Sequence, residues 1–177
     1  MAGAIACNKA DYEKLWFTRQ ALGTTLDAYS ASLLERGLKT FDMRAERMAH
    51  NAMAMAEFLK GHPKISKTFY PGLVDDPGHA VASRQMKNGF CGMLAFNVGN
   101  SQEDAKNFIT NLETIYHAVS LGSTETLICI PYLTTMLYLP PERRVGFGVE
   151  KNTVRLSAGI DKTGLLIDDL KQALDKI

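Results

Sequence analysis

Apolar residues recur along the first third of the chain with a helical period. From about Leu26 to Leu59 they are spaced alternately by four and three residues, which predicts one long helix with an apolar face, weakened or kinked near Gly37. A shorter helix is predicted over residues 10–22, and the small residues at positions 2–7 favour a short strand before it. The chain is therefore expected to open as strand, helix and long helix.

The pattern changes beyond Gly61 and Pro63, two residues that end helices. Short strands and helices then alternate, and Pro140-Pro141 is expected to break the chain. Strands are predicted at 65–70, 90–98, within 119–130 and at 153–157, and helices at 81–86, 102–117 and 162–177. Few short strands with helices between them indicate an α/β fold class, more narrowly an α+β domain with a small sheet covered by helices on one face.

Composition and charge narrow the setting of the protein. A formal net charge of +1 gives no reason to expect a nucleic acid or a membrane surface as partner, and no apolar run reaches the roughly 18 residues of a membrane span. The first residues lack the features of a secretory signal, so a cytoplasmic location is expected. The three cysteines, Cys7, Cys91 and Cys129, are far apart and are predicted to be buried structural thiols in a reducing compartment.

Two features, Arg155 and the turn at residues 120–122, are candidates for a functional site. The four histidines are not, because they have no metal-ligand spacing, and no metal site is predicted. Arg155, however, lies inside the apolar stretch 154–160, where a guanidinium is costly unless acceptors meet it. It either sits on an exposed edge strand or in an ion pair, or it binds a carboxylate with two parallel hydrogen bonds. Ser120-Leu121-Gly122 is either an ordinary turn or a bend that presents amides and a hydroxyl to a ligand.

Four stretches together resemble one enzyme family. They are VRLSAGI (154–160) with a D-D-L-x-Q-A-L tail after it, SLGSTETL (120–127), the helical stretch 34–59, and YPGLVDDPGHAVASRQM (70–86). In this order they resemble the C-terminal part of the Cys/Met metabolism family of pyridoxal-phosphate (PLP) enzymes, which includes cystathionine γ-lyase, cystathionine γ-synthase and methionine γ-lyase. The resemblance implies the C-terminal part of a fold-type I PLP-dependent transferase.

The family's architecture implies three regions in this chain. Residues 1–40 would be the tail of the large cofactor-binding domain, 41–60 a linking helix, and 61–177 the small C-terminal domain with an antiparallel sheet. The implied activity is γ-elimination or γ-replacement on sulfur amino acids, with PLP as the cofactor of the complete enzyme. The implied partners are a small amino-acid substrate and an N-terminal cofactor-binding portion or homologous subunit, in an oligomer.

The resemblance also assigns roles to single residues. Arg155 matches the arginine that holds the substrate α-carboxylate. Ser120 matches the serine that helps to position the substrate and the cofactor lysine, and Thr135 matches a threonine near the substrate entrance. Val119 stands where cystathionine-processing members often carry Glu, which favours an uncharged thioether over a substrate with a distal amino-carboxylate group and leans the specificity toward methionine or homocysteine. The stretch I-P-Y-L-T-T-M (130–136) departs from the family's H-P-A-S-M-T-H, so the substrate side chain stays open.

The family's cofactor lysine lies directly before the strand that matches residues 2–7, so it would precede Met1. Lys9 follows that strand at a turn position and does not match it. We therefore expect no catalytic residue in this chain, and no retention of PLP by the chain alone. Three interpretations remain: half of an enzyme that works beside an N-terminal partner, an inactive interaction domain, and an unrelated small ligand-binding α+β domain.

Overall fold

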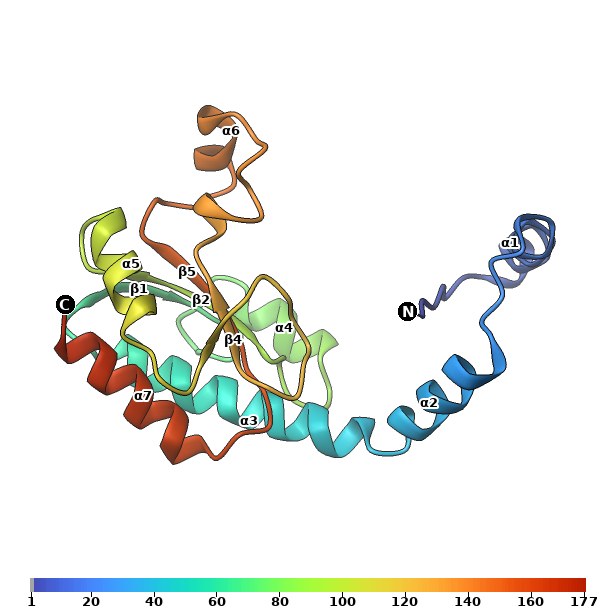
Figure 1. Cartoon of the computed structure of the whole chain (residues 1–177), viewed down its shortest axis with the longest axis horizontal. Coiled ribbons are helices and arrows are strands. Elements are labelled where there is room, and N and C mark those ends of the chain that lie inside the picture. The colour runs from blue at the N-terminus through green and yellow to red at the C-terminus, as the bar shows by residue number, and fades with distance from the viewer. Residues whose placement is uncertain (1) are drawn as a thin grey trace. The chain divides into compact units, whose positions relative to one another are not determined.

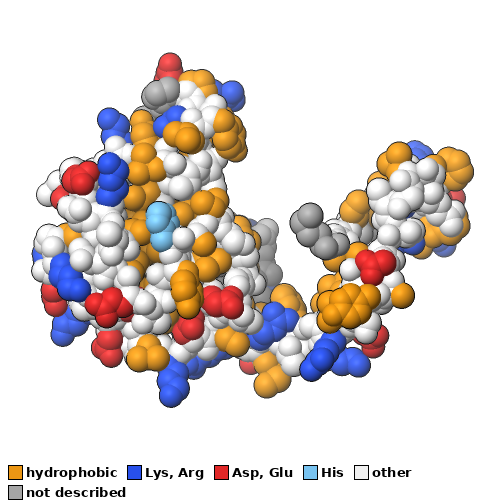
Figure 2. All heavy atoms as spheres, in the orientation of Figure 1, with side chains coloured by type: hydrophobic (Ala, Val, Ile, Leu, Met, Phe, Trp, Pro, Cys, Tyr) orange, Lys and Arg blue, Asp and Glu red, His pale blue; other side chains and the backbone are white. Residues whose placement is uncertain are grey.

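The computed structural model describes residues 2–177, and the chain divides into two compact units, one up to Asp42 and one from Met43 (Figure 1). The first unit contains α1 (Lys9–Leu22) and α2 (Ala28–Leu38). Each helix has a side-chain N-cap: the carboxamide of Asn8 and the carboxylate of Asp27 each accept from a backbone N–H three residues on, both at 2.9 Å. No residue of α1 or α2 is buried, and apolar side chains lie on their surface (Figure 2).

Two expectations about this region are wrong. Residues 2–7 form no strand, because a strand needs the backbone of a neighbour and the described part of this unit supplies none. The expected single long helix is two helices, α2 and α3 (Phe41–Lys60). At the break, both the backbone N–H and the hydroxyl of Thr40 lie 3.4 Å from the carbonyl of Gly37 and end the regular ladder there.

The second unit is built on a five-stranded sheet in the order β1-β2-β5-β4-β3 (Figure 1). All neighbours are antiparallel except β3 and β4, which are parallel, so the expected small and mainly antiparallel sheet is confirmed. The strands are β1 (Ile65–Phe69), β2 (Met93–Val98), β3 (Tyr116–His117), β4 (Leu127–Cys129) and β5 (Thr153–Ser157).

The helices of this unit follow the prediction with two corrections. The helix expected over 102–117 ends at Thr110, and its last residues form β3 instead. Pro140-Pro141 does not simply break the chain, since α6 starts at Pro141, a residue type that is common in the first turn of a helix. Besides α3, the unit contains α4 (His79–Gln85), α5 (Gln102–Thr110), the 3₁₀ turn η1 (Pro131–Leu133), α6 (Pro141–Gly146) and α7 (Thr163–Asp175). None of the helices among residues 2–177 is long and apolar enough to span a membrane.

One face of the sheet packs against helices and the other carries the polar residues of interest. Alternate strand residues such as Leu94, Phe96, Val154 and Leu156 are at most 2% exposed and form a core with α3, α5 and α7. The helices thus cover one face, as predicted. Arg155 alternates with these residues and lies on the opposite face.

The cysteines match their prediction only in part. Cys129 is buried and Cys91 partly buried, but Cys7 is exposed, so its expected burial is wrong. All three are free thiols.

Candidate functional site

Arg155 lies in the middle of the sheet. Its strand β5 is flanked by β2 and β4, and its Cα pairs with those of Ala95 and Cys129. The exposed edge strand that was one explanation of this arginine is therefore wrong. The ordinary ion pair is excluded as well, because no ion pair among residues 2–177 includes Arg155.

The guanidinium of Arg155 is only partly satisfied by the protein. Its Nη2 donates to the backbone carbonyls of Val119 (2.9 Å) and Ser120 (3.2 Å). Its Nε is buried and has no acceptor among the described residues. A buried polar group without a partner costs about 1–3 kcal/mol, more if it is charged. A carboxylate is the acceptor that matches the planar fork of a guanidinium, so the arrangement fits a bound anion better than a closed structural contact.

A second contact fastens the 119–122 loop to the same strand. The hydroxyl of Ser157, two residues after Arg155 and therefore on the same face, accepts a hydrogen bond of 2.9 Å from the N–H of Gly122. Gly122 has a φ of 71°, a left-handed conformation that glycine adopts without strain. Ser157 was missed by the sequence reasoning, although its spacing of two residues from Arg155 was the available signal.

The four residues singled out from the sequence are only partly brought together. The backbones of Val119 and Ser120 contact Arg155, while both side chains are exposed. Thr135 is partly buried and follows η1, which begins two residues after Cys129, the strand partner of Arg155. No hydrogen bond between Thr135 and Arg155 or Ser120 occurs in the described part of the chain.

The lysines and histidines give no sign of a covalent or metal site. Each lysine is exposed except Lys64, whose Nζ donates to the carbonyls of Leu174 (2.8 Å) and Ile177 (2.6 Å) at the end of α7. His79 is held by the Pro71 carbonyl at 2.8 Å. Residues 2–177 contain no group of three or more possible metal ligands.

Comparisons with known proteins agree on one family. The model of the family described as Cys/Met metabolism PLP-dependent enzyme matches residues 1–175. The chain is 38% identical over 175 residues to a cystathionine gamma-lyase of Dictyostelium discoideum, covering 98% of this chain and 45% of that protein. It is 40% identical over 179 residues to an L-methionine gamma-lyase of Fusobacterium nucleatum subsp. polymorphum, covering 100% and 45%.

Solved structures give the same result. A cystathionine gamma-lyase from Lactobacillus plantarum complexed with L-serine superposes with a TM-score of 0.89 and 32% identity, over 98% of this chain and 45% of that one. A cystathionine gamma synthase from Xanthomonas oryzae pv. oryzae, in complex with aminoacrylate and cysteine, gives 0.91 and 35%, over 97% and 44%. The chain thus spans less than half the length of the relatives it matches. On its fold and on nearly its whole sequence, the chain belongs to the Cys/Met metabolism family of PLP-dependent enzymes.

Proposed function

We propose that this chain is the C-terminal part of a PLP-dependent enzyme that eliminates or replaces the γ-substituent of a sulfur amino acid, and that Arg155 binds the substrate α-carboxylate. The observation that carries the proposal is the buried Nε of Arg155, which lacks an acceptor in the centre of the sheet. Family membership and the lyase and synthase names of the relatives support it.

The residues described here fit the substrate and do not fit the covalent attachment of the cofactor. PLP supplies an electron sink for the carbanion chemistry of amino acids when it is bound. Its attachment needs a lysine within a pocket, whereas the lysines of residues 2–177 are exposed or, in the case of Lys64, bonded to the end of α7. We therefore assign substrate binding to this chain, and covalent attachment of PLP to an N-terminal portion or a homologous subunit.

Arg155 and the 119–122 loop would orient the substrate. Arg155 stands on a central strand, so its backbone is held on both sides by hydrogen-bonded neighbours. The carbonyls of Val119 and Ser120 fix the direction of the guanidinium, and Ser157 fixes the loop through Gly122. A carboxylate bound at this fork has one orientation, which aligns the bonds at the substrate α-carbon before reaction. Ser120 lies beside this fork and is assigned contact with both substrate and cofactor.

Val119 supports a preference for an uncharged substrate side chain. Its carbonyl lies 2.9 Å from Nη2 of Arg155, so its side chain projects from a residue next to the proposed carboxylate site. A valine offers neither charge nor hydrogen bond to a distal amino or carboxylate group. Methionine or homocysteine is therefore preferred over cystathionine, with Thr135 near the substrate entrance.

The test uses the intact protein, purified from its own host and then supplied with PLP. Thiol and 2-oxo acid release is followed with methionine, homocysteine and cystathionine. Arg155→Lys keeps the charge but loses the fork, and we expect kcat/KM to fall roughly 100-fold, since loss of a hydrogen bond to a charged group costs about 1.5–3 kcal/mol. Arg84→Lys, at an exposed position on α4, is the matched control and should leave kcat/KM within twofold. Absence of thiol release from all three substrates, or equal rates in both variants, would refute the proposal.

A second candidate function rests on the apolar surface of the first unit. Trp16, Phe17, Tyr29 and Leu33 are all exposed, between 44% and 74%, on two helices without any buried residue. Such a surface supports an interaction domain that lacks activity of its own. In that case the purified protein would associate with another polypeptide, would release no thiol from any of the three substrates, and would be insensitive to Arg155→Lys.

A further inference from the structure

Arg144 is a nearly buried arginine that the proposed reaction does not use. It lies on α6, is 9% exposed, and forms no ion pair among residues 2–177. Its neighbour Arg143 on the same helix is exposed. Burial of a guanidinium with neutral acceptors alone is costly, so the contacts of Arg144 should indicate its role.

All hydrogen bonds of its guanidinium go to one stretch of backbone. Nε donates to the carbonyl of Leu139 at 2.8 Å, Nη1 to Tyr132 at 3.2 Å and Nη2 to Leu137 at 2.7 Å. The guanidinium carbon also lies 4.7 Å from the centre of the Tyr132 ring, a stacking distance. One side chain thus joins both ends of the segment Tyr132–Leu139. A lysine has a single nitrogen and cannot span three carbonyls in this way.

The held segment lies beside the proposed carboxylate site. It starts three residues after Cys129, which pairs directly with Arg155 on the neighbouring strand, and its first turn η1 packs on β5. Paired residues of adjacent antiparallel strands have their Cα atoms about 4.5–5.5 Å apart. An amino acid held by its carboxylate at Arg155 therefore has a long side chain within reach of this segment, which contains Thr135.

We propose that Arg144 is a positioning residue that sets the conformation of the Tyr132–Leu139 segment, and through it the fit of the substrate side chain. The inference rests on the proposed function, because it takes Arg155 as the carboxylate site. The two arginines then have different roles. Arg155 binds the α-carboxylate that all amino acids share, and Arg144 shapes the surface that distinguishes one side chain from another.

The test compares two amino acids that carry the same carboxylate and lack a leaving group. L-norleucine has a long apolar side chain and L-alanine a short one, and each is measured as a competitive inhibitor of the intact, PLP-loaded protein. Arg144→Ala should raise the Ki of norleucine about tenfold and leave that of alanine within twofold. Arg143→Ala is the matched control and should change neither. Arg155→Lys should raise both together.

A second readout reports on the segment itself. Backbone amide hydrogen exchange across residues 132–139 should become faster in Arg144→Ala and stay unchanged in Arg143→Ala. If Arg144→Ala fails to fold, Arg144→Lys and Tyr132→Leu replace it, the second of which removes only the stacked ring. We expect both to raise the norleucine Ki selectively.

The outcomes separate this inference from the proposed function. Equal losses for norleucine and alanine in Arg144→Ala, or unchanged exchange across 132–139, would overturn the inference and leave the function of Arg155 in place. Binding of neither amino acid to the wild-type protein would overturn the proposed function and this inference together.

Discussion

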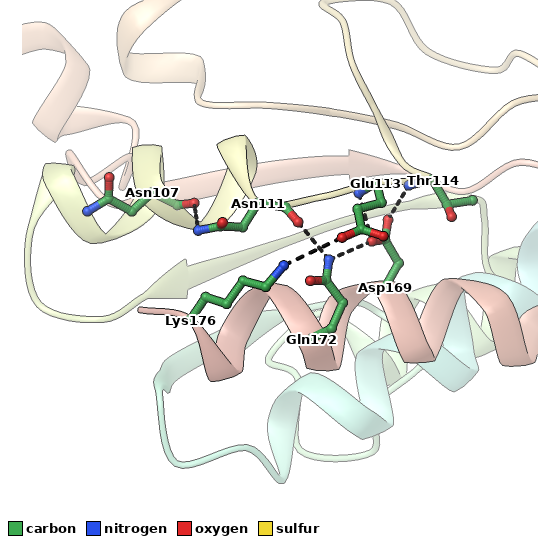
Figure 3. A network of polar contacts seen from close by, with 7 residues as sticks. All are labelled: Asn107, Asn111, Glu113, Thr114, Asp169, Gln172 and Lys176. Atoms are coloured by element: carbon green, nitrogen blue, oxygen red, sulfur yellow. Dashed lines mark hydrogen bonds and ion pairs between the residues drawn. The ribbon is translucent and has the colours of Figure 1, made fainter.

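Substitution of Asp169 on α7 should strongly destabilise the second unit. The residue is 5% exposed, and its carboxylate accepts the backbone N–H groups of Glu113 (2.8 Å) and Thr114 (2.9 Å), drawn in Figure 3. It also accepts the N–H of Ile115 (2.8 Å), and these three residues lie in the turn that connects α5 to β3. Gln172 donates to the same carboxylate at 2.9 Å. This one side chain thus accepts hydrogen bonds from three successive backbone N–H groups of the turn.

Asp169→Asn tests this role with almost no change of shape. The amide has one acceptor oxygen, so at least one of the three N–H groups would face an NH₂ group. Losing a hydrogen bond to a charged acceptor costs about 1.5–3 kcal/mol, and an unsatisfied buried donor adds to this, so we expect a loss of about 3 kcal/mol. With an m-value of about 2 kcal/mol/M, the midpoint of urea unfolding falls by about 1.5 M. Asp168→Asn, at an exposed position of the same helix, should shift it by less than about 0.3 M.

The difference between wild type and Asp169→Asn should also depend on pH. Burial acts to raise the pKa of Asp169, but the backbone N–H groups of Glu113, Ile115 and Thr114 outweigh it and hold the pKa below its usual value. A carboxylate with a lowered folded-state pKa stabilises the fold above its unfolded pKa of about 3.9, and this contribution is lost as pH falls through the folded value. The midpoint difference should therefore be full at pH 7 and shrink below about pH 4. A difference that is the same at pH 7 and pH 3, or no larger than that of Asp168→Asn, would refute the reasoning.

Two further predictions concern a tightly packed glycine after β5 and a buried tyrosine after β1. Gly159→Ala should lower the free energy of urea unfolding by about 1–3 kcal/mol, because a Cβ there would overlap the backbone of Thr124 and Glu125. Gly164→Ala, with open space around it, should be close to neutral, and equal effects of the two variants would contradict the packing argument. Burial raises the pKa of Tyr70 to about 12. The stability of the wild type should therefore fall between about pH 10 and 12, where the unfolded chain has lost the phenolic proton and the folded chain still keeps it. Tyr70→Phe should flatten this fall, whereas Tyr12→Phe, at an exposed position, should not.

The sequence predicted the elements that rest on local signals and missed those that rest on distant hydrogen bonds. The strands at 65–70 and 153–157 are confirmed because short runs that contain apolar and β-branched residues mark them locally. The helix expected over 102–117 was drawn too long. The turn that ends it is held by Asp169, more than fifty residues away, and a local pattern carries no trace of that bond.

The candidate site shows the same limit. Arg155 was recognisable because a guanidinium contradicts its apolar neighbours, and this conflict is visible within a few residues. Ser157 and Arg144 show no such conflict, because a small hydroxyl residue in a strand and an arginine in a polar helical stretch do not contradict their neighbours. Ser157 matters because its hydroxyl accepts the N–H of Gly122, and Arg144 because it donates to the carbonyls of Tyr132 and Leu137. Only the folded chain brings these groups together.

Arg155 on β5 and Arg144 on α6 differ in which of their nitrogens lack an acceptor, and this difference assigns their roles. Arg144 donates from Nε and from both terminal nitrogens to backbone carbonyls, so each of its three nitrogens already has an acceptor. Arg155 bonds two carbonyls through Nη2 alone and keeps a buried Nε without an acceptor. Since carbonyls are neutral, the positive charge of Arg155 also remains uncompensated in a partly water-excluded place, where a carboxylate gains most from it. Arg155, with a nitrogen that lacks an acceptor among the described residues, is therefore suited to bind the substrate, and Arg144, bonded through all three nitrogens, to hold the segment beside it.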